Sequence, residues 1–348
     1  MPAFLPVLLG PLLASTASAV PSAPAGSNLA RGENVLLFDA PAYETTTCPV
    51  RHLSTVQAYT YNNGSVDAVA NVFHGFLSAS GIEVDEQRLE ILRSRSKYFA
   101  TTPIGGKIAQ IEVDGARVVS LLARQQFQTI ALMMPVLLNI RVVSALSGKE
   151  GWGVISDIDD TIKISGHGID AVTATLIDEA TPVSGIPAVY STLTELIDPA
   201  WIYLTGSPWQ LYGMLHDFIH TYFSESTGPI LMKNLTYTGV EGLLEFLAEG
   251  TSLEYKAGKI DDIHSWHPKK QYLGIGDSSG NDPEAYAYAY RQYGSAWMKC
   301  IWIHVVEEGN NTAARWTEAF KGIPRSVYQL YTSSSELNPE ALLEGDCF

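Results

Sequence analysis

The chain has 348 residues, of which 46% are hydrophobic, and a formal net charge of −15. This length and composition suffice for one large folded domain or two ordinary ones. The acidic balance argues against nucleic-acid binding, which depends on Lys and Arg side chains that neutralise phosphates. It also argues against attraction to anionic membranes through bulk charge, and we interpret it as an aid to solubility in an extracellular medium.

Residues 1–19 have the pattern of a removable signal peptide. An apolar stretch at 4–13 precedes an Ala-Ser-Ala triplet that fits a small-residue cleavage site. The stretch is too short to span a bilayer. The next apolar segment, 130–146, is interrupted by polar residues and is interpreted as core strands. We therefore expect a secreted chain without a transmembrane segment, in which residues 20–31, rich in Pro, Ala, Gly and Ser, form a loose leader.

Two further features concern secretion. Triplets at Asn63, Asn234 and Asn310 have the Asn-x-Ser/Thr pattern of glycosylation acceptors. The three cysteines cannot all pair internally, so one disulfide and one free thiol are possible, and the sequence does not assign the pair. So few cysteines exclude a disulfide-dense scaffold, and burial of apolar surface must supply the stability. No spacing in the sequence suggests a zinc site.

Residues 32–150 predict a small β-rich domain. The apolar segment 35–38 is typical of a strand. Segments 108–113 and 117–122 flank an Asp-Gly pair, which is typical of a hairpin with a two-residue turn. Residues 84–95 have apolar side chains at helical spacing and predict one helix. The chemistry of this domain cannot be inferred from its sequence.

From residue 151 the pattern changes to alternating strands and helices. The predicted strands are 153–156, 201–205, 230–232, 271–275 and 300–305. Such alternation predicts a parallel sheet flanked by helices. The fold class is therefore α/β, with this domain extending over 151–335 and followed by a tail at 336–348.

Two helices of this domain are clearly marked. One apolar face runs through 211–223, and Ser207 has the position of its N-cap in a capping box. The second helix covers 253–266, with Ile260 on its buried side. Lys256 is expected on the side away from Ile260, where a single lysine is usually solvated.

Acidic side chains directly follow the first strand of this domain. Asp157 and Asp159 come after the apolar run 153–156, and residues two apart in an extended chain point the same way. Ligands of open α/β sheets bind at the carboxyl ends of the strands. Two carboxylates there invite a divalent cation and leave an oxygen free to attack a phosphorus, although such a pair could also only start a turn.

Polar residues also follow two other strands. Gly206 and Ser207 come after Thr205 at the end of the second strand, where a hydroxyl beside a helix start makes an anion site. Ser207 could instead only cap its helix. The fourth strand ends at Asp277, and Asp282 precedes a proline, so Asp282 could also be an ordinary N-cap.

These segments resemble the four-motif pattern of the haloacid dehalogenase superfamily. The motifs are, in order, Asp157-x-Asp159-x-Thr161, Thr205, Lys256, and Gly276-Asp277 with Asp282. Residues 151–305 further resemble the fungal phosphatidate phosphatase family first linked to cortical actin patches. The resemblance implies a Rossmann-like sheet of the haloacid dehalogenase type, and a Mg²⁺-dependent phosphatase that acts on phosphatidate or a related lipid phosphomonoester.

The resemblance also implies roles for individual residues. Asp157 is the expected nucleophile, which forms an aspartyl-phosphate. Asp159 is the expected acid and base, with its proton held by the like charge of neighbouring carboxylates or by bound phosphate. Thr205 and Lys256 are expected to stabilise charge on the phosphoryl oxygens.

The implied ligands of Mg²⁺ are Asp157, the backbone carbonyl of Asp159, and Asp277. Asp282 is expected to orient Lys256 or a metal-bound water. Residues expected to contact substrate are Thr161, Lys163, Gly206, Ser207 and Trp209, although Lys163 and Trp209 could equally be structural.

Two other classes of function stay open. Gly276-Asp277-Ser278-Ser279-Gly280 has the G-x-S-x-G pattern of a serine hydrolase, and His304 is the only histidine that follows it in the sequence. A secreted lipase with Ser278 as nucleophile is therefore one alternative. A non-enzymatic binding module on the phosphatase fold is another, although every expected catalytic position is present.

Overall fold

The structure is a computed structural model. The structure describes residues 33–39, 41–44, 52–104, 107–113, 116–123, 128–133, 146–147, 150–233, 252–307 and 309–348. The expected signal peptide, the leader, the Asp-Gly turn, Cys48 and Asn234 lie outside these residues. Among the residues that are described, no helix combines the length and apolar character needed to cross a membrane.

The chain divides into two compact units. Unit 1 comprises residues 1–64 and 101–149, and unit 2 comprises residues 65–100 and 150–348. The helical segment 65–100 thus groups with unit 2, so the two units do not follow a single break near residue 150.

Unit 1 is a small β structure around the long strand β3 (His52–Asn63). This strand pairs antiparallel with β1, β2, β4 and β7, and β2 pairs parallel with β8. Strands β5 and β6 form a separate antiparallel hairpin, as predicted. The bounds are β1 Glu33–Leu37, β2 Ala42–Glu44, β4 Thr101–Pro103, β5 Lys107–Val113, β6 Ala116–Ala123, β7 Gln128–Met133 and β8 Leu146–Ser147.

Unit 2 is built on a parallel sheet in the order β11-β10-β9-β12-β13-β14. The strands are β9 Trp152–Ser156, β10 Ala200–Pro208, β11 Ile230–Lys233, β12 Gln271–Asp277, β13 Met298–His304 and β14 Tyr328–Tyr331. The sheet grows outward from β9 in one direction and from β12 in the other. The order therefore reverses between β9 and β12, and the carboxyl ends of these two strands are where such sheets bind ligands.

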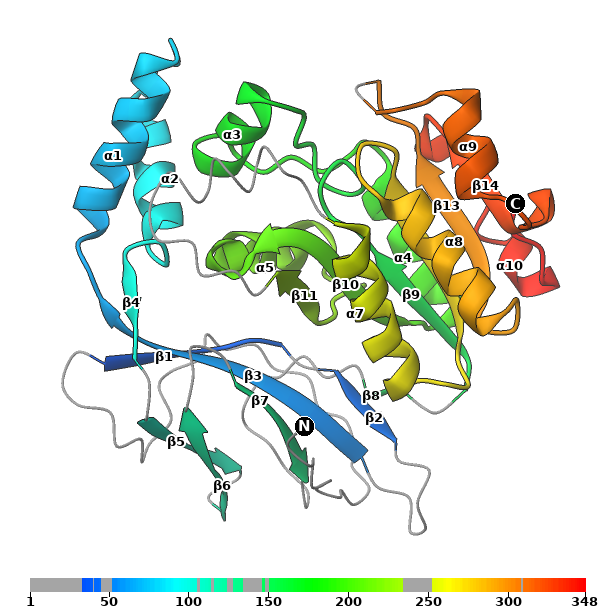
Figure 1. Ribbon diagram of the computed structural model, residues 1–348, viewed down its shortest axis with the longest axis horizontal. Helices are drawn as coiled ribbons and strands as arrows, with labels where there is room; N and C mark the ends of the chain where they lie inside the picture. Colours follow the sequence, from blue (N-terminus) through cyan, green and yellow to red (C-terminus); the bar gives the residue numbers. More distant parts are fainter. Residues whose placement is uncertain are drawn as a thin grey trace. The chain divides into compact units, whose positions relative to one another are not determined.

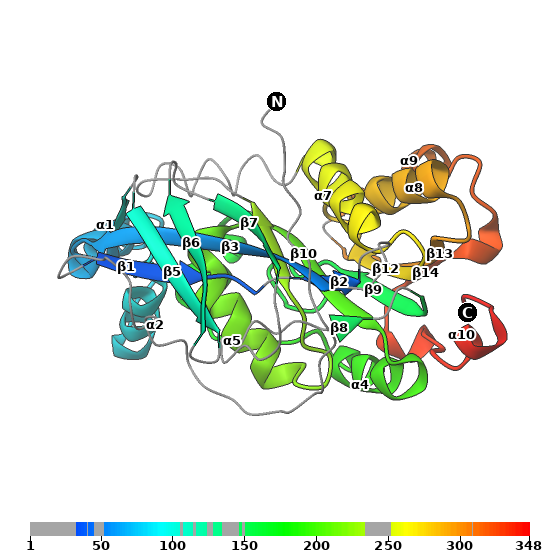
Figure 2. The same ribbon diagram turned by 90° about the horizontal axis from the view of Figure 1, so that it is seen from below.

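Helices cover both faces of this sheet. Figure 2 shows α7 and α8 on one face and α4 and α5 on the other. Within the described residues, the α-helices of unit 2 are α1 Val66–Ala79, α2 Glu86–Ser96, α3 Ile169–Leu176, α4 Ile186–Ile197, α5 Tyr212–Tyr222, α7 Leu253–Trp266, α8 Asp282–Tyr293, α9 Ala313–Ala319 and α10 Ala341–Glu344. The α/β class with flanking helices and a small β-rich part before it is confirmed (Figure 1).

The core beneath α7 and α8 explains why the alternating pattern folds in this way. Ile155 of β9, Ile202 of β10 and Ile301 of β13 are fully or almost fully buried, and Ile260 and Ile263 of α7 pack in the same cluster. Apolar runs in the strands and apolar stripes on the helices therefore meet in one continuous core. Burial of this surface is the main stabilising contribution of such a core.

The predicted N-terminus of the helix that follows β10 is wrong. Strand β10 continues through Ser207 to Pro208, a 3₁₀ turn covers Trp209–Leu211, and α5 begins only at Tyr212. No side chain caps either of these two starts. The sequence of the capping box is present, but the Ser207 hydroxyl has a different partner in the site described below.

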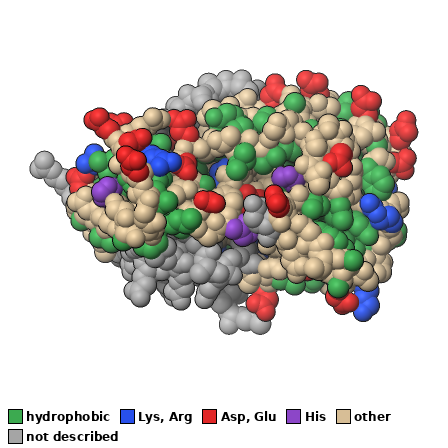
Figure 3. All heavy atoms as spheres, turned by 90° about the horizontal axis from the view of Figure 1, so that it is seen from above, with side chains coloured by type: hydrophobic (Ala, Val, Ile, Leu, Met, Phe, Trp, Pro, Cys, Tyr) green, Lys and Arg blue, Asp and Glu red, His purple; other side chains and the backbone are tan. Residues whose placement is uncertain are grey.

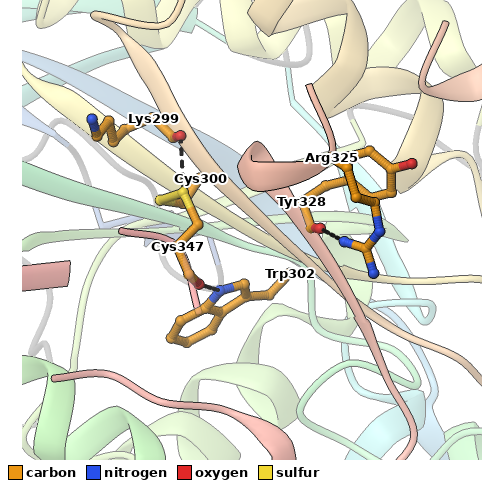
Figure 4. Close-up of a disulfide and its surroundings, with 6 residues drawn as sticks. All are labelled: Lys299, Cys300, Trp302, Arg325, Tyr328 and Cys347. Atoms are coloured by element: carbon orange, nitrogen blue, oxygen red, sulfur yellow. Dashed lines mark hydrogen bonds between the residues drawn. A yellow bond between two sulfur atoms is a disulfide. The ribbon is translucent and has the colours of Figure 1, made fainter. Parts of the chain in front are cut away.

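A disulfide joins the sheet to the C-terminal segment (Figure 4). Cys300 of β13 and Cys347 are both buried, with their Cα atoms 5.4 Å apart. The indole Nε1 of Trp302 donates to the backbone carbonyl of Cys347 over 2.8 Å. The tail after α10 is therefore held against the core sheet by one covalent bond and one buried hydrogen bond.

Removing this disulfide should lower stability measurably. The two cysteines are 47 residues apart, and we expect Cys347→Ala to lower the free energy of unfolding by about 4 kcal/mol, the chain-entropy value for a loop of this length. Denaturant unfolding of oxidised wild type, reduced wild type and the variant would measure this difference. Reduced wild type should resemble the variant, whereas equal stability of all three samples would show that the disulfide does not stabilise the fold.

Candidate active site

The site lies where the strand order reverses. Asp157 directly follows β9, and Asp277 is the last residue of the neighbouring strand β12. The backbone N–H of Asp157 donates to the carbonyl of Ile275 in β12 over 2.8 Å. Both carboxylates are thus delivered to one point by adjacent strands.

Lys256 of α7 reaches the same point. Its Nζ donates to Oδ1 of Asp157 over 2.8 Å and to Oδ1 of Asp282, the first residue of α8. The ammonium group is buried, and Lys256 lies on the same helix face as Ile260 and Ile263. The prediction of a side chain turned away from that face is wrong, because two buried carboxylates compensate the charge of Lys256.

Three carboxylates gather around this lysine. Asp157, Asp277 and Asp282 each present an oxygen, and these oxygens lie within 4.8 Å of one another. The three residues are between 0% and 4% exposed. Such a cluster of buried oxygens is a candidate cation site, and we call it the carboxylate cluster.

The electrostatics of the carboxylate cluster favour a cation. Burial raises the pKa of Asp157 to about 8; the charge of Asp282 adds to this rise and that of Lys256 opposes it. Burial likewise raises the pKa of Asp282 to about 7 and that of Asp277 to about 6. For Lys256, burial acts to lower the pKa, but the neighbouring negative charges outweigh it and raise the pKa. The carboxyls therefore hold protons more tightly than free aspartate does, and a bound cation would displace them.

A short loop fixes the orientation of Asp277. Oδ1 of Asp277 accepts hydrogen bonds from the backbone N–H groups of Ser279 and Gly280. The N–H of Asp277 donates to Oδ2 of Asp282 over 3.3 Å. Gly276 permits this close packing, because a Cβ at that position would lie 2.4 Å from the Cβ of Asp282. Steric space thus explains why a glycine precedes Asp277 in the sequence.

Asp159 has a different environment from the carboxylate cluster. Its Oδ1 accepts from Nζ of Lys163 over 2.9 Å and from the Ser165 hydroxyl over 2.7 Å. Its Oδ2 accepts from the hydroxyls of Ser207 and Thr205 over 3.0 and 3.3 Å. Thr205 and Ser207 therefore both donate hydrogen bonds to Asp159, and Ser207 does not cap a helix.

This environment favours the ionised form of Asp159. Burial acts to raise the pKa of Asp159, but the charge of Lys163 and the hydrogen bonds from Ser165, Lys163 and Ser207 outweigh it and lower the pKa to about 2. Of the two expected sources of a proton on Asp159, this environment does not favour the neighbouring carboxylates, and bound phosphate stays the expected one. The sequence does not reveal that Lys163, which is 1% exposed, folds back onto Asp159.

The remaining predicted site residues take varied positions. The Thr161 hydroxyl donates to Oδ2 of Asp157 over 3.0 Å. Gly206 lies in β10 between Thr205 and Ser207. Trp209 is 2% exposed, and its ring centroid lies 6.1 Å from that of Tyr98. Thr161 thus orients the expected nucleophile, whereas Trp209 is part of the packed interior.

Two positions that shape the site were not anticipated. Asp160 adopts a left-handed conformation with φ 55°, and its Oδ1 accepts from the backbone N–H groups of Ser165 and Gly166. Aspartate tolerates this conformation better than most residues, which is the only indication in the sequence. The Tyr286 hydroxyl of α8 lies 3.1 Å and 2.9 Å from the carbonyl oxygens of Ile155 and Ile275, which share its single proton, and so links β9 to β12 beneath the site.

The serine-hydrolase alternative does not fit this geometry. Ser278 is fully buried, and its Oγ accepts from the backbone N–H of Val306 over 3.0 Å. The Nδ1 of His304 lies 2.6 Å from the carbonyl oxygen of Asp160. The Ser278 hydroxyl donates to the backbone carbonyl of Val306 over 3.5 Å, where a nucleophilic serine would donate to a base, and His304 lies against another carbonyl.

The fold and the order of the motifs are consistent with the haloacid dehalogenase superfamily. Residues 152–305 match the family described as phosphatidate phosphatase APP1, catalytic domain. The chain is 30% identical over 148 residues to phosphatidate phosphatase APP1 of Saccharomyces cerevisiae. That alignment covers 41% of this chain and 24% of the yeast protein, so the chain spans about a quarter of its relative's length. The resemblance seen in the sequence motifs is thereby confirmed for this segment.

Proposed function

We propose that unit 2 is a Mg²⁺-dependent phosphatase that removes phosphate from phosphatidate or a related lipid phosphomonoester. The observation that carries this proposal is the meeting of Asp157, Asp277, Asp282 and Lys256 at the reversal point of the sheet. The match to the catalytic domain of a phosphatidate phosphatase supports the same reaction.

The donor set fits Mg²⁺. Three ionised carboxylates and one ammonium leave two buried negative charges, which a divalent cation balances. All the side-chain donors are oxygens, which Mg²⁺ prefers, and in such sites it retains several waters. We assign Asp157, Asp277 and the backbone carbonyl of Asp159 as ligands, and Oδ2 of Asp282, which also accepts from the N–H of Asp277, as a further candidate. When bound, the cation would neutralise charge on the phosphoryl oxygens.

Asp157 is the proposed nucleophile. An oxygen of its carboxylate attacks the phosphorus, the bond from phosphorus to the ester oxygen breaks, and an aspartyl-phosphate forms on Asp157. Thr161 and Lys256 hold the two carboxylate oxygens in fixed directions. Lys256 also offers positive charge to the phosphoryl group as it transfers.

Asp159 is the proposed acid for the leaving alkoxide and base for the attacking water. To act as an acid it must first gain a proton, although Lys163 lowers its pKa in the present arrangement. A phosphate group that enters the site brings negative charge and competes for Lys163. Both effects raise the pKa of Asp159 and favour its protonated form.

Secretion and glycosylation remain proposals. The disulfide Cys300–Cys347 fits a chain that folds in an oxidising compartment. The acceptors Asn63 and Asn310 are both exposed, as a glycan requires. Figure 3 shows Asp and Glu side chains spread over one face and fewer Lys and Arg, in keeping with the net charge of −15.

The affinity for Mg²⁺ should rise with pH between about 6 and 8. Burial raises the pKa values of Asp277, Asp282 and Asp157 to about 6, 7 and 8, so Mg²⁺ competes with protons in this range. Each displaced proton should strengthen apparent binding roughly tenfold per pH unit. Calorimetry in two buffers of different ionisation enthalpy would count the protons released. Binding that is independent of pH over this range would contradict the assignment of these carboxyls as ligands.

A substrate panel tests the proposed function. Phosphatidate, other phosphorylated lipids and water-soluble phosphomonoesters would be assayed for phosphate release with Mg²⁺ and with EDTA. We expect release from a lipid phosphate that is lost in EDTA and restored by Mg²⁺. Release that is insensitive to EDTA, together with labelling of Ser278 by a fluorophosphonate, would favour the serine hydrolase instead.

A further inference from the structure

We propose that Arg315 is a positioning residue for the carboxylate cluster, acting through the loop 278–281 between β12 and α8. The proposal rests on the function proposed above, because it connects Arg315 to the Mg²⁺ site. Arg315 lies in α9, beyond the segment 152–305 that matches the phosphatidate phosphatase family. The comparison therefore assigns it no role.

Every N–H group of the Arg315 guanidinium has an acceptor. Nε and Nη2 donate to the two carboxylate oxygens of Glu284 over 2.9 and 3.0 Å. Nη1 donates to the backbone carbonyls of Ser278 and Asn310, and Nη2 also donates to the carbonyl of Gly280. A guanidinium offers five donors in a rigid plane, which the single ammonium of lysine cannot reproduce. The side chain is 11% exposed, so water competes little for these bonds.

The loop transmits this contact to the carboxylate cluster. It begins directly after Asp277 and ends directly before Asp282. Arg315 binds the loop carbonyls of Ser278 and Gly280. The backbone N–H groups of Ser279 and Gly280, in the same loop, donate to Oδ1 of Asp277. Arg315 thus holds the loop in the conformation that orients the Asp277 carboxylate.

The two ends of the loop are held in different ways. The N–H of Ser278 donates to the carbonyl of His304 over 2.9 Å, and its Oγ accepts from the N–H of Val306. Gly280 has the Arg315 contact and the bond to Asp277. Loss of Arg315 should therefore release the Gly280 end while Ser278 stays bound near the end of β13. We expect weaker metal binding in a protein that still folds.

The test compares two arginines that both donate to backbone carbonyls. Arg315→Lys removes the planar donor set at the loop. Arg291→Lys is the matched control, because Arg291 of α8 donates to the carbonyls of Ala319 and Lys321 and does not bind the loop. Mg²⁺ affinity would be measured by calorimetry, and phosphate release would be followed as a function of Mg²⁺ concentration.

Arg315→Lys should bind Mg²⁺ about tenfold more weakly or worse, because groups that orient a metal ligand typically contribute a factor of this size to affinity. Arg291→Lys should bind it like wild type. Saturating Mg²⁺ should restore most of kcat to Arg315→Lys, which a general loss of structure would not permit. If folded Arg315→Lys binds Mg²⁺ with wild-type affinity, the role of Arg315 is wrong but the proposed function is not affected. If the wild-type protein does not bind Mg²⁺, the metal-dependent function itself is refuted.

A second variant covers the case in which Arg315→Lys does not fold. Glu284→Gln keeps the size of the side chain but loses the charge that binds Nε and Nη2 of the guanidinium. We expect Mg²⁺ affinity to fall by at least about threefold. Unchanged affinity in Glu284→Gln would overturn the role of Arg315.

Discussion

Asp157→Asn should reduce phosphate release by about a thousandfold or more, because an amide cannot form the aspartyl-phosphate. The fold should survive the change. Burial raises the pKa of Asp157 to about 8, so the ionised form is disfavoured near neutral pH and a neutral amide removes that cost. Initial rates with saturating substrate and Mg²⁺, together with thermal unfolding in Mg²⁺-free buffer, would measure both effects.

Asp160→Asn is the matched control for this variant. Asp160 is in the same motif, and asparagine also tolerates its left-handed conformation and can still accept from Ser165 and Gly166. We expect its rate to stay within about tenfold of wild type, since the residue shapes the loop and does not contact the carboxylate cluster. Near-normal turnover by Asp157→Asn would show that the proposed mechanism is wrong.

Lys256→Met should impair both stability and catalysis. The change leaves Asp157 and Asp282 buried without their shared cation, and breaking a buried pair in this way typically costs about 3 kcal/mol or more. Activity should fall by at least about a hundredfold, because the charge on the transferring phosphoryl group loses a partner. Urea unfolding at several pH values and steady-state kinetics would measure the two losses.

The stability loss in Lys256→Met should depend on pH. Carboxyls whose folded pKa exceeds the unfolded value contribute stability that is lost as pH rises through the folded pKa. The pKa values of Asp282 and Asp157 are already raised to about 7 and 8 by burial, and removal of Lys256 raises them further. The variant should therefore be least stable above pH 8 and recover towards pH 6.

Lys259→Met provides the reference for Lys256→Met in the same helix. Lys259 pairs with Asp262 over 2.9 Å, and both side chains are partly solvated. Removing an exposed pair should change the free energy of unfolding by less than about 1 kcal/mol and leave activity intact. A Lys256→Met protein that behaves like Lys259→Met would contradict the assigned role of the buried lysine.

The sheet of unit 2 could be predicted because its strands are nearly continuous apolar runs. All five strands expected from the sequence are present, and α7 has the predicted bounds. Strand β14 was not predicted, because the segment from Tyr328 to Tyr331 has three half-buried residues and no apolar run. Local pattern therefore identified the strands that have an apolar run, including the edge strand β11, whose residues are alternately buried and half-buried.

The partners of the site residues could not be predicted in the same way. The pattern of α7 cannot distinguish a solvated lysine from one buried against two carboxylates, because Asp157 and Asp282 are remote in sequence. The partner of Ser207 could not be predicted either: the sequence has a capping-box pattern, but the Ser207 hydroxyl donates to Asp159, which is remote in sequence. Arg315 was missed altogether, since its function depends on backbone carbonyls that no motif encodes.

The central claim is that a carboxylate oxygen of Asp157 forms a bond to the phosphorus of the substrate. An acid quench of the enzyme with phosphatidate and Mg²⁺ would trap the acyl phosphate, and borohydride would reduce it to homoserine at that position. Peptide mass spectrometry would then locate the changed residue. We predict homoserine at position 157 in a sample with substrate and none in a sample with EDTA. Turnover with an unmodified Asp157, or with phosphate trapped on another residue, would contradict the account.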